Sequence, residues 1–124
     1  MNAATTLAVL RFENLAGDPE QEYFARGFVD DLLAELSRFP NLEVLHRDRA
    51  PGSPEPAVAH YLRGGVRRLG DVVRIAAQLV EAKSGRQLWA ERFAAPAENL
   101  LAVQYDIVAR VVSAFAIEVD EARL

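Results

Sequence analysis

Cysteine is absent from this 124-residue sequence, and its absence excludes several kinds of site. Without thiols the chain has no disulfides, no thiolate nucleophile and no Cys-ligated zinc, and its redox compartment stays open. Histidine occurs only at His46 and His60, without the H-x-x-x-H spacing of many zinc sites. We therefore expect no metal site and no cofactor.

Long apolar runs and a secretory leader are also missing. No apolar stretch approaches the roughly 18 residues that a membrane-spanning helix needs, so we expect no membrane insertion. Residues 1–6, MNAATT, lack the basic and apolar regions of a signal peptide. These features favour a cytoplasmic location for the chain as given. A periplasmic location stays open if the chain is a piece of a membrane-anchored protein.

The motifs of phosphate-binding and hydrolytic enzymes are absent as well. The segment GVRRLGD, residues 65–71, has the glycine spacing of a P-loop but carries Asp71 where the lysine is needed. Neither GxGxxG nor GxSxG occurs. Asp30 and Asp31 are neighbours on a predicted helix, where adjacent side chains point about 100° apart and do not form a carboxylate pair. We expect no catalytic residues and no enzymatic activity.

What remains is the composition of one globular domain. Apolar residues make up 51% of the chain and charged residues 26%, and this length suffices for one core. We expect residues 1–124 to form a single domain with a proline-rich loop at 47–58 and flexible ends at 1–5 and 120–124. The net charge of −4 argues against nucleic-acid binding.

Positive charge is concentrated in the middle of the chain. Residues 59–93 hold seven Lys/Arg against three Asp/Glu, whereas the segments on both sides are acidic. Two interpretations are open: exposed strand positions that discourage edge pairing, or a surface for an anion or an acidic partner. The cations concerned are six arginines: Arg63, Arg67, Arg68, Arg74, Arg86 and Arg92.

Hydrophobic periodicity predicts five strands and two helices. The strands are expected at 6–12, 42–46, 59–68, 72–83 and 86–93, and the helices at 19–38 and 97–119. Gly64 and Gly65 in the third strand indicate a bulge or a close approach of another part of the chain. The helical crossover requires a parallel first pair and the later meander requires antiparallel pairs. The fold class is α/β, a mixed five-stranded sheet with helices packed on it.

Two local features can be interpreted structurally or functionally. Trp89 is either covered by a helix or part of a partner surface. In the polar loop after the first strand, Asp18 is predicted to be the N-cap of the first helix, and Asn14 can bond its own backbone. The same polar loop, which begins with Glu13, could instead contact a ligand.

Two long segments resemble the TolB-amino-terminal-like domain. They are VLRFENLAGDPEQEYFARGFVDDLLAELSRF at 9–39 and VRRLGDVVRIAAQLVEAKSGRQLWAERF at 66–93. The resemblance extends over residues 6–47 and 59–116. This bacterial family is found in class III adenylate/guanylate cyclases and in CadC-type winged-helix regulators, commonly before tetratricopeptide repeats.

The resemblance implies a three-layer, anticodon-binding-domain-like fold with strand order 2-1-3-4-5 and strand 4 antiparallel. The family's helix between strands 2 and 3 is here missing or replaced by the loop RDRAPGSPEPA, residues 47–57. One sheet face then needs cover from a second copy, a neighbouring domain or that loop. The family domain is not itself the cyclase and has no agreed catalytic residues.

We therefore expect a non-catalytic regulatory or protein-interaction domain that self-associates, with a homodimer favoured, or that belongs to a bacterial signalling protein. The alternative is a sensory module that binds a small molecule or nucleotide through the 13–18 loop and the arginine-bearing strands. The candidate residues for binding are Glu13, Asn14, Asp18, Arg63, Arg67, Arg74, Trp89 and Arg92.

Overall fold

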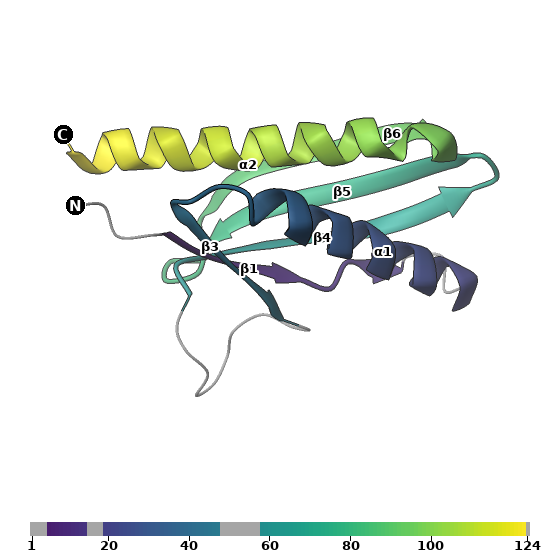
Figure 1. Ribbon diagram of the computed structural model, residues 1–124, viewed down its shortest axis with the longest axis horizontal. Helices are drawn as coiled ribbons and strands as arrows, with labels where there is room; N and C mark the ends of the chain where they lie inside the picture. Colours follow the sequence, from purple (N-terminus) through teal and green to yellow (C-terminus); the bar gives the residue numbers. More distant parts are fainter. Residues whose placement is uncertain (1–4, 15–18, 48–57, 124) are drawn as a thin grey trace.

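The computed structural model describes residues 5–14, 19–47 and 58–123, and side chains within these ranges except at 20, 21 and 115–123. Two helices lie across a twisted sheet (Figure 1). In chain order the elements are β1 (Thr5–Leu10), β2 (Glu13–Asn14), α1 (Pro19–Leu36), β3 (Leu42–Arg47), β4 (His60–Leu69), β5 (Val72–Glu81), β6 (Gln87–Pro96), the 3-10 turn η1 (Ala97–Asn99) and α2 (Leu100–Arg123).

The sheet is mixed, which confirms the predicted α/β class. Its strands follow the order β3-β1-β4-β5-β6. β1 is parallel to β3 and β4, whereas β5 is antiparallel to both β4 and β6. A sixth strand, β2, pairs with β4 beyond the end of β1. The expectation of five strands was wrong by this one element, because two residues are too few to show a hydrophobic period.

Both described helices lie in one layer, and the expected third layer stays a prediction. α1 and α2 contact each other and pack on the same face of the sheet (Figure 1). One core cluster contains side chains from both helices and from that face. The described residues therefore form two layers. Residues 48–57 of the proline-rich segment, where the family's helix was expected to be missing or replaced by a loop, lie outside the described residues. The predicted cap residue Asp18 lies outside them as well.

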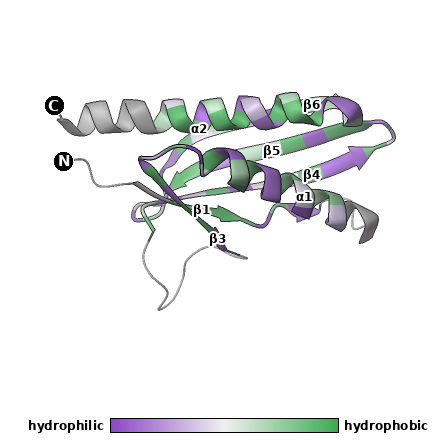
Figure 2. Ribbon diagram, in the orientation of Figure 1, coloured by the Kyte–Doolittle hydropathy of each residue, from purple (hydrophilic) through white to green (hydrophobic). Residues whose placement is uncertain are grey.

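The core follows the predicted apolar stripes. α1 contributes Phe28, Leu32 and Leu36, and α2 contributes Val103, Ile107 and Val111 (all buried). β5 turns Val73, Ile75, Ala77 and Leu79 toward the helices. Figure 2 shows the apolar and polar residues interleaved along β4 and β5, as a sheet with two different faces requires.

Gly64 marks the predicted close approach in β4. A Cβ atom at this position would overlap the carbonyl oxygen of Ala76 and lie 2.8 Å from Cε2 of Phe12. The missing side chain lets the Phe12 ring lie over β4, where its centroid is 5.7 Å from that of Phe28. The glycine therefore joins the sheet to α1 through an aromatic pair.

Candidate interaction surface

The face of β4, β5 and β6 that points away from both helices is called the open face below. Because side chains alternate along a strand, it carries the residues between those that enter the core. Beside the row Tyr61–Val80–Gln87, strand pairing arranges the part of this face that carries the arginines in four rows: Arg63–Gln78–Ala90, Gly65–Ala76–Arg92, Arg67–Arg74–Ala94 and Leu69–Val72–Pro96. Among the described residues no helix covers this face.

Three arginines lie close together on the open face. Arg67 and Arg74 are directly opposed across the β4–β5 pair, and Arg92 lies one row away on β6. All three are exposed. None of them forms an ion pair or a side-chain hydrogen bond with another residue that the structure describes. They surround a shallow groove of about 440 Å³ whose floor includes Ala76 and Ala94.

This arrangement is unfavourable for the isolated domain. Like charges directly opposite each other on neighbouring strands destabilise a sheet, and no described acidic residue forms an ion pair with these arginines, although Glu13 of β2 adjoins this face at Gly65. Glu91, the acid nearest along β6, instead pairs with Arg110 of α2 across the core side (Oε1 to NH2, 3.8 Å). Guanidinium groups bind carboxylates and phosphates in a planar, two-pronged geometry. The open face can therefore bind a partner that presents such anions.

Arg63 differs from the other three arginines because it is held by its neighbours. Its Nε donates a hydrogen bond to Oε1 of Gln78 at 2.6 Å. Its guanidinium also lies 5.9 Å from the centroid of the Tyr61 ring, within the range of a cation–π contact. Arg63 therefore forms an ordered border of the open face.

The structure brings only some of the predicted binding residues together. Trp89 lies on the core side, half-buried, with its ring centroid 6.2 Å from that of Phe93. This position fits cover by the helical layer better than a place on the open face. Glu13 and Asn14 form β2 beside Gly65 and Val66, so Glu13 adjoins the open face and Asn14 does not.

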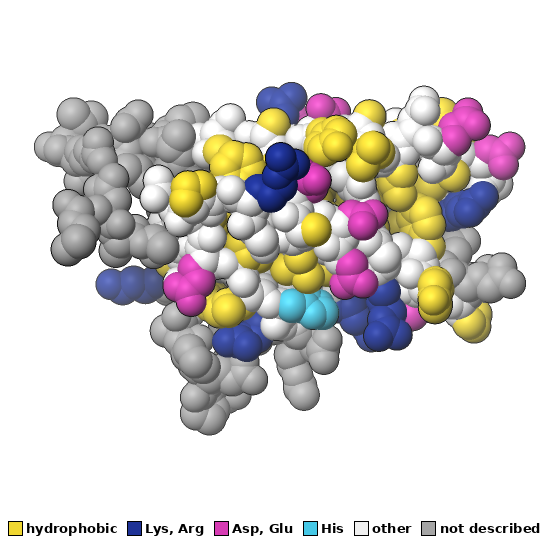
Figure 3. All heavy atoms as spheres, viewed as in Figure 1, with side chains coloured by type: hydrophobic (Ala, Val, Ile, Leu, Met, Phe, Trp, Pro, Cys, Tyr) yellow, Lys and Arg dark blue, Asp and Glu magenta, His cyan; other side chains and the backbone are white. Residues whose placement is uncertain are grey.

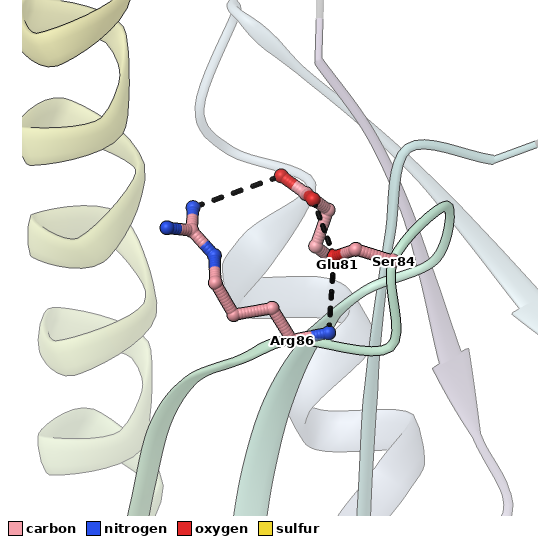
Figure 4. A network of polar contacts seen from close by, with 3 residues as sticks. All are labelled: Glu81, Ser84 and Arg86. Atoms are coloured by element: carbon pink, nitrogen blue, oxygen red, sulfur yellow. Dashed lines mark hydrogen bonds and ion pairs between the residues drawn. The ribbon is translucent and has the colours of Figure 1, made fainter.

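The remaining two arginines of the basic segment have side chains that bond at turns. Arg68 donates a hydrogen bond from Nε to the carbonyl oxygen of Gly70 at 3.0 Å. Arg86 lies at the β5–β6 hairpin, where its NH2 is 3.8 Å from Oε2 of Glu81. Figure 4 shows the same network, in which Ser84 Oγ donates to Glu81 and accepts from the backbone N–H of Arg86. For these two arginines a local structural role is sufficient.

A second candidate site lies between α1 and β3. It is a cleft of about 580 Å³ at the carboxyl ends of the parallel strands β1 and β3, the place where open α/β sheets commonly bind ligands. Figure 3, which shows the face that carries the helices, has acidic, basic and histidine side chains mixed around apolar surface. The lining residues are Arg11, Glu22, Arg26, Val29, Asp30 and His46.

Sequence reasoning missed this cleft, because its residues come from three separate segments and form no motif. Arg11 and Glu22 are already joined by an ion pair of 3.6 Å between NH1 and Oε1. The parallel β-α-β topology was the only available signal, since it brings the ends of β1 and β3 to one edge. Among the described residues no cluster of three or more metal-ligating side chains occurs. The described helices also include none with the length and apolarity to cross a membrane.

Comparisons with known proteins now add to this geometry. No family model matches the sequence. The chain is 36% identical over 127 aligned positions to "Putative adenylate cyclase 3" of Rhizobium meliloti. The alignment covers 94% of this chain and 22% of that protein. The structure of TolB from Acinetobacter baumannii matches with a TM-score of 0.70 and 14% identity, over 90% of this chain and 28% of TolB.

Protein XCC0632 from Xanthomonas campestris matches with a TM-score of 0.73 and 10% identity, over 96% of this chain and 90% of that one. The chain has the fold of a TolB-amino-terminal-like domain. The resemblance inferred from the sequence is thereby confirmed. The chain spans 22% of the length of the cyclase relative that it matches.

The TolB-like fold also occurs in a protein that forms a large assembly. The PelC dodecamer from Paraburkholderia phytofirmans matches with a TM-score of 0.57 and 16% identity, over 92% of this chain and 89% of that one.

Proposed function

We propose that this TolB-like domain is a non-catalytic protein-interaction domain of a bacterial signalling protein and that it binds its partner through the open face. The observation that carries the proposal is the group of three exposed arginines, Arg67, Arg74 and Arg92, which lack a partner among the described residues. A binding surface explains why the sheet tolerates their mutual repulsion.

The charge distribution supports an acidic partner. The chain as a whole carries a net charge of −4, whereas every charged residue in the four rows of the open face is an arginine. Such a local basic surface on an acidic protein orients and accelerates the approach of an anionic surface. The same rows contain arginine, glutamine, alanine, glycine, proline and aliphatic residues, so they offer no nucleophile and no general base.

The relatives support a role inside a larger protein. The cyclase relative is several times longer than this chain, so the matching segment is one part of a multidomain protein. The strand order of the sheet, with a single antiparallel strand, fits the anticodon-binding-domain-like arrangement that the resemblance implies. A domain of this kind would transmit a signal by contacting another domain or another chain.

The test is the binding of a synthetic Glu-rich peptide, measured by isothermal titration calorimetry at low and at moderate salt. A triple variant with Arg67, Arg74 and Arg92 changed to Gln should lose at least tenfold in affinity. The matched control changes Arg38, Lys83 and Arg110 to Gln, which removes the same charge from positions outside the open face and outside the cleft between α1 and β3, and should bind as the wild type does. Equal binding by both variants would refute the proposed role of the open face.

A second candidate function is the binding of a small molecule in the cleft between α1 and β3. The cleft volume of about 580 Å³ lies in the range of ligand sites, and Arg11, Arg26 and His46 could hold an anionic group there. A thermal-shift screen of nucleotides and small carboxylates tests it, because a ligand of the native state raises the melting temperature. A flat response at millimolar concentrations would eliminate this function.

A further inference from the structure

We infer, building on the proposed function, that the partner of the open face is a second copy of this chain, docked head to tail. The contacting part of that copy is the outer ridge of α2, which we define as Glu98 of η1 together with Leu101, Tyr105 and Asp106. One copy inserts this ridge into the arginine-rimmed groove of the next copy.

The outer ridge of α2 has the chemistry that the groove requires. Leu101 and Tyr105 are 56% and 50% exposed, and they lie one helical turn apart on the same side of α2. Glu98 and Asp106 flank them and are exposed as well. Neither carboxylate forms an ion pair or a hydrogen bond with another described residue. Along the helix axis the two apolar side chains lie between the two carboxylates, and around the axis Asp106 points about 100° away from Tyr105.

The open face offers matching positions. Ala76 and Ala94 leave the groove floor low enough for a helix to approach the sheet. At one end, Leu69 and Val72 are 54% and 43% exposed and add apolar surface for the ridge to cover. The apolar side chains of the ridge would lie over the alanine floor, and its carboxylates would meet the arginines on the border.

The spacing of the charges also agrees. Glu98 lies in η1 and Asp106 lies eight residues further on in α2, which corresponds to about 12–13 Å along the axis at roughly 2.0 Å per residue in a 3-10 turn and 1.5 Å in an α-helix. Arg67 and Arg92 lie on strands separated by β5 and are offset by one row, which gives about 12 Å from standard strand spacings. One straight helix can therefore bring a carboxylate to each side of the groove.

Head-to-tail symmetry follows from where the two surfaces lie. α2 belongs to the helical layer, whereas the groove belongs to the opposite side of the sheet. In a two-fold dimer both subunits use the same patch, and that requires the ridge and the groove to lie on the same side of the molecule. Because they lie on opposite sides, two copies make only one ridge-to-groove contact, and the pair keeps one unused ridge and one unused groove. Further copies then add until a ring closes or a filament forms. The PelC dodecamer shows that a protein with this fold can build a large assembly.

The experiment uses light scattering on purified protein at low salt. The wild type should have a mass of more than two monomers of 13.7 kDa. Arg74→Glu spoils the groove, and Asp106→Arg spoils the ridge, so each variant alone should be a monomer. The control Arg38→Glu changes a charge outside both surfaces and should assemble like the wild type. Circular dichroism checks that every variant is folded.

Mixing the two monomeric variants is the decisive step. The intact ridge of the Arg74→Glu variant fits the intact groove of the Asp106→Arg variant, so the mixture should form a 1:1 dimer that cannot grow. No complex in the mixture, or assembly of either variant alone, would overturn the head-to-tail contact. A monomeric wild type that still binds the Glu-rich peptide would overturn self-association and leave the proposed function standing. A monomer that binds no such peptide would refute both.

Discussion

Replacing Gly64 by alanine tests whether the sheet and α1 are joined as the structure shows. The added methyl group would overlap the carbonyl oxygen of Ala76 and press on the ring of Phe12. The ring could move only by disturbing its contact with Phe28, and the carbonyl oxygen belongs to the backbone and cannot rotate away. Overpacking of a well-filled site typically costs 1–3 kcal/mol. We expect the upper end, about 3 kcal/mol.

The matched control is Gly27→Ala, which adds the same methyl group in the exposed middle of α1. Nothing lies within 4 Å of the new Cβ atom, and alanine is favoured over glycine inside a helix by roughly 0.5–1 kcal/mol. This variant should therefore be more stable than the wild type. The two substitutions are chemically identical but should change the free energy of unfolding in opposite directions.

Urea denaturation followed by circular dichroism measures both changes in the free energy of unfolding, and thermal denaturation measures the matching shifts of the melting temperature. With an unfolding entropy of about 2.1 cal/mol/K per residue, a loss of about 3 kcal/mol lowers the melting temperature by roughly 12 °C, and the control raises it by roughly 2–4 °C. The measurement should be made in high salt, which weakens association through charged surfaces. A Gly64→Ala variant within about 0.5 kcal/mol of the wild type would refute the close approach between β4, β5 and Phe12.

Three further substitutions test other parts of the account. Arg74→Gln removes the opposed like charge of Arg67 and, in protein diluted until copies no longer associate, should leave stability unchanged or raise it by a few tenths of a kcal/mol at low salt; a clear loss in thermal unfolding of the diluted sample would show that Arg74 has a structural role. Ser84→Ala removes the two hydrogen bonds of the Ser84 hydroxyl at the β5–β6 hairpin and should lower the free energy of unfolding by about 1 kcal/mol in urea denaturation. An unchanged midpoint would show that these two bonds contribute nothing to stability. Gln104 of α2 is 3% exposed, and its Nε2 donates a hydrogen bond to Oδ2 of Asp31 in α1 at 3.1 Å. A double-mutant cycle with alanine at both positions should give a coupling free energy of about 0.5–1.5 kcal/mol. A coupling of zero would contradict this contact between the helices.

Much of the fold could be predicted because its apolar periods are regular. In β5 the alternation of Val73, Ile75, Ala77 and Leu79 runs without interruption, and all four side chains are buried as predicted. The hairpin at Ser84 and Gly85 was also predictable, because a glycine between two strands is typical of a tight turn. In the structure Gly85 has a φ of +75°, a conformation that favours glycine. Such signals are local and need no knowledge of the rest of the chain.

Other features depend on contacts that no local pattern reveals. Helical periodicity shows that α1 and α2 have an apolar face, but not that both cover the same side of the sheet. The register shift between Leu79 and Val80 could not be predicted either, because it depends on how β5 pairs with β6. The strand β6 extends to Pro96, three residues beyond the predicted end, because residues 94–96 pair with Val72–Arg74.

The candidate sites also differ in whether a local sequence pattern could predict them. The meander predicted that the arginines of β4, β5 and β6 would lie close together, because a residue on one strand faces a definite residue on the next. The separation of Trp89 from them required the side of the sheet to be known. The cleft residues Arg11, Arg26 and His46 could not be grouped at all, since only the parallel pairing of β1 with β3 places them around one cavity.

The most direct test of the open face as a binding surface is arginine-selective labelling with phenylglyoxal, quantified residue by residue by mass spectrometry. The wild type is labelled at low salt, once concentrated and once diluted. We predict that Arg67, Arg74 and Arg92 are protected in the concentrated sample and become reactive on dilution, while Arg38 on the α1 side is equally reactive in both. Equal labelling of all four arginines at both concentrations would contradict the claim that a second copy covers this face.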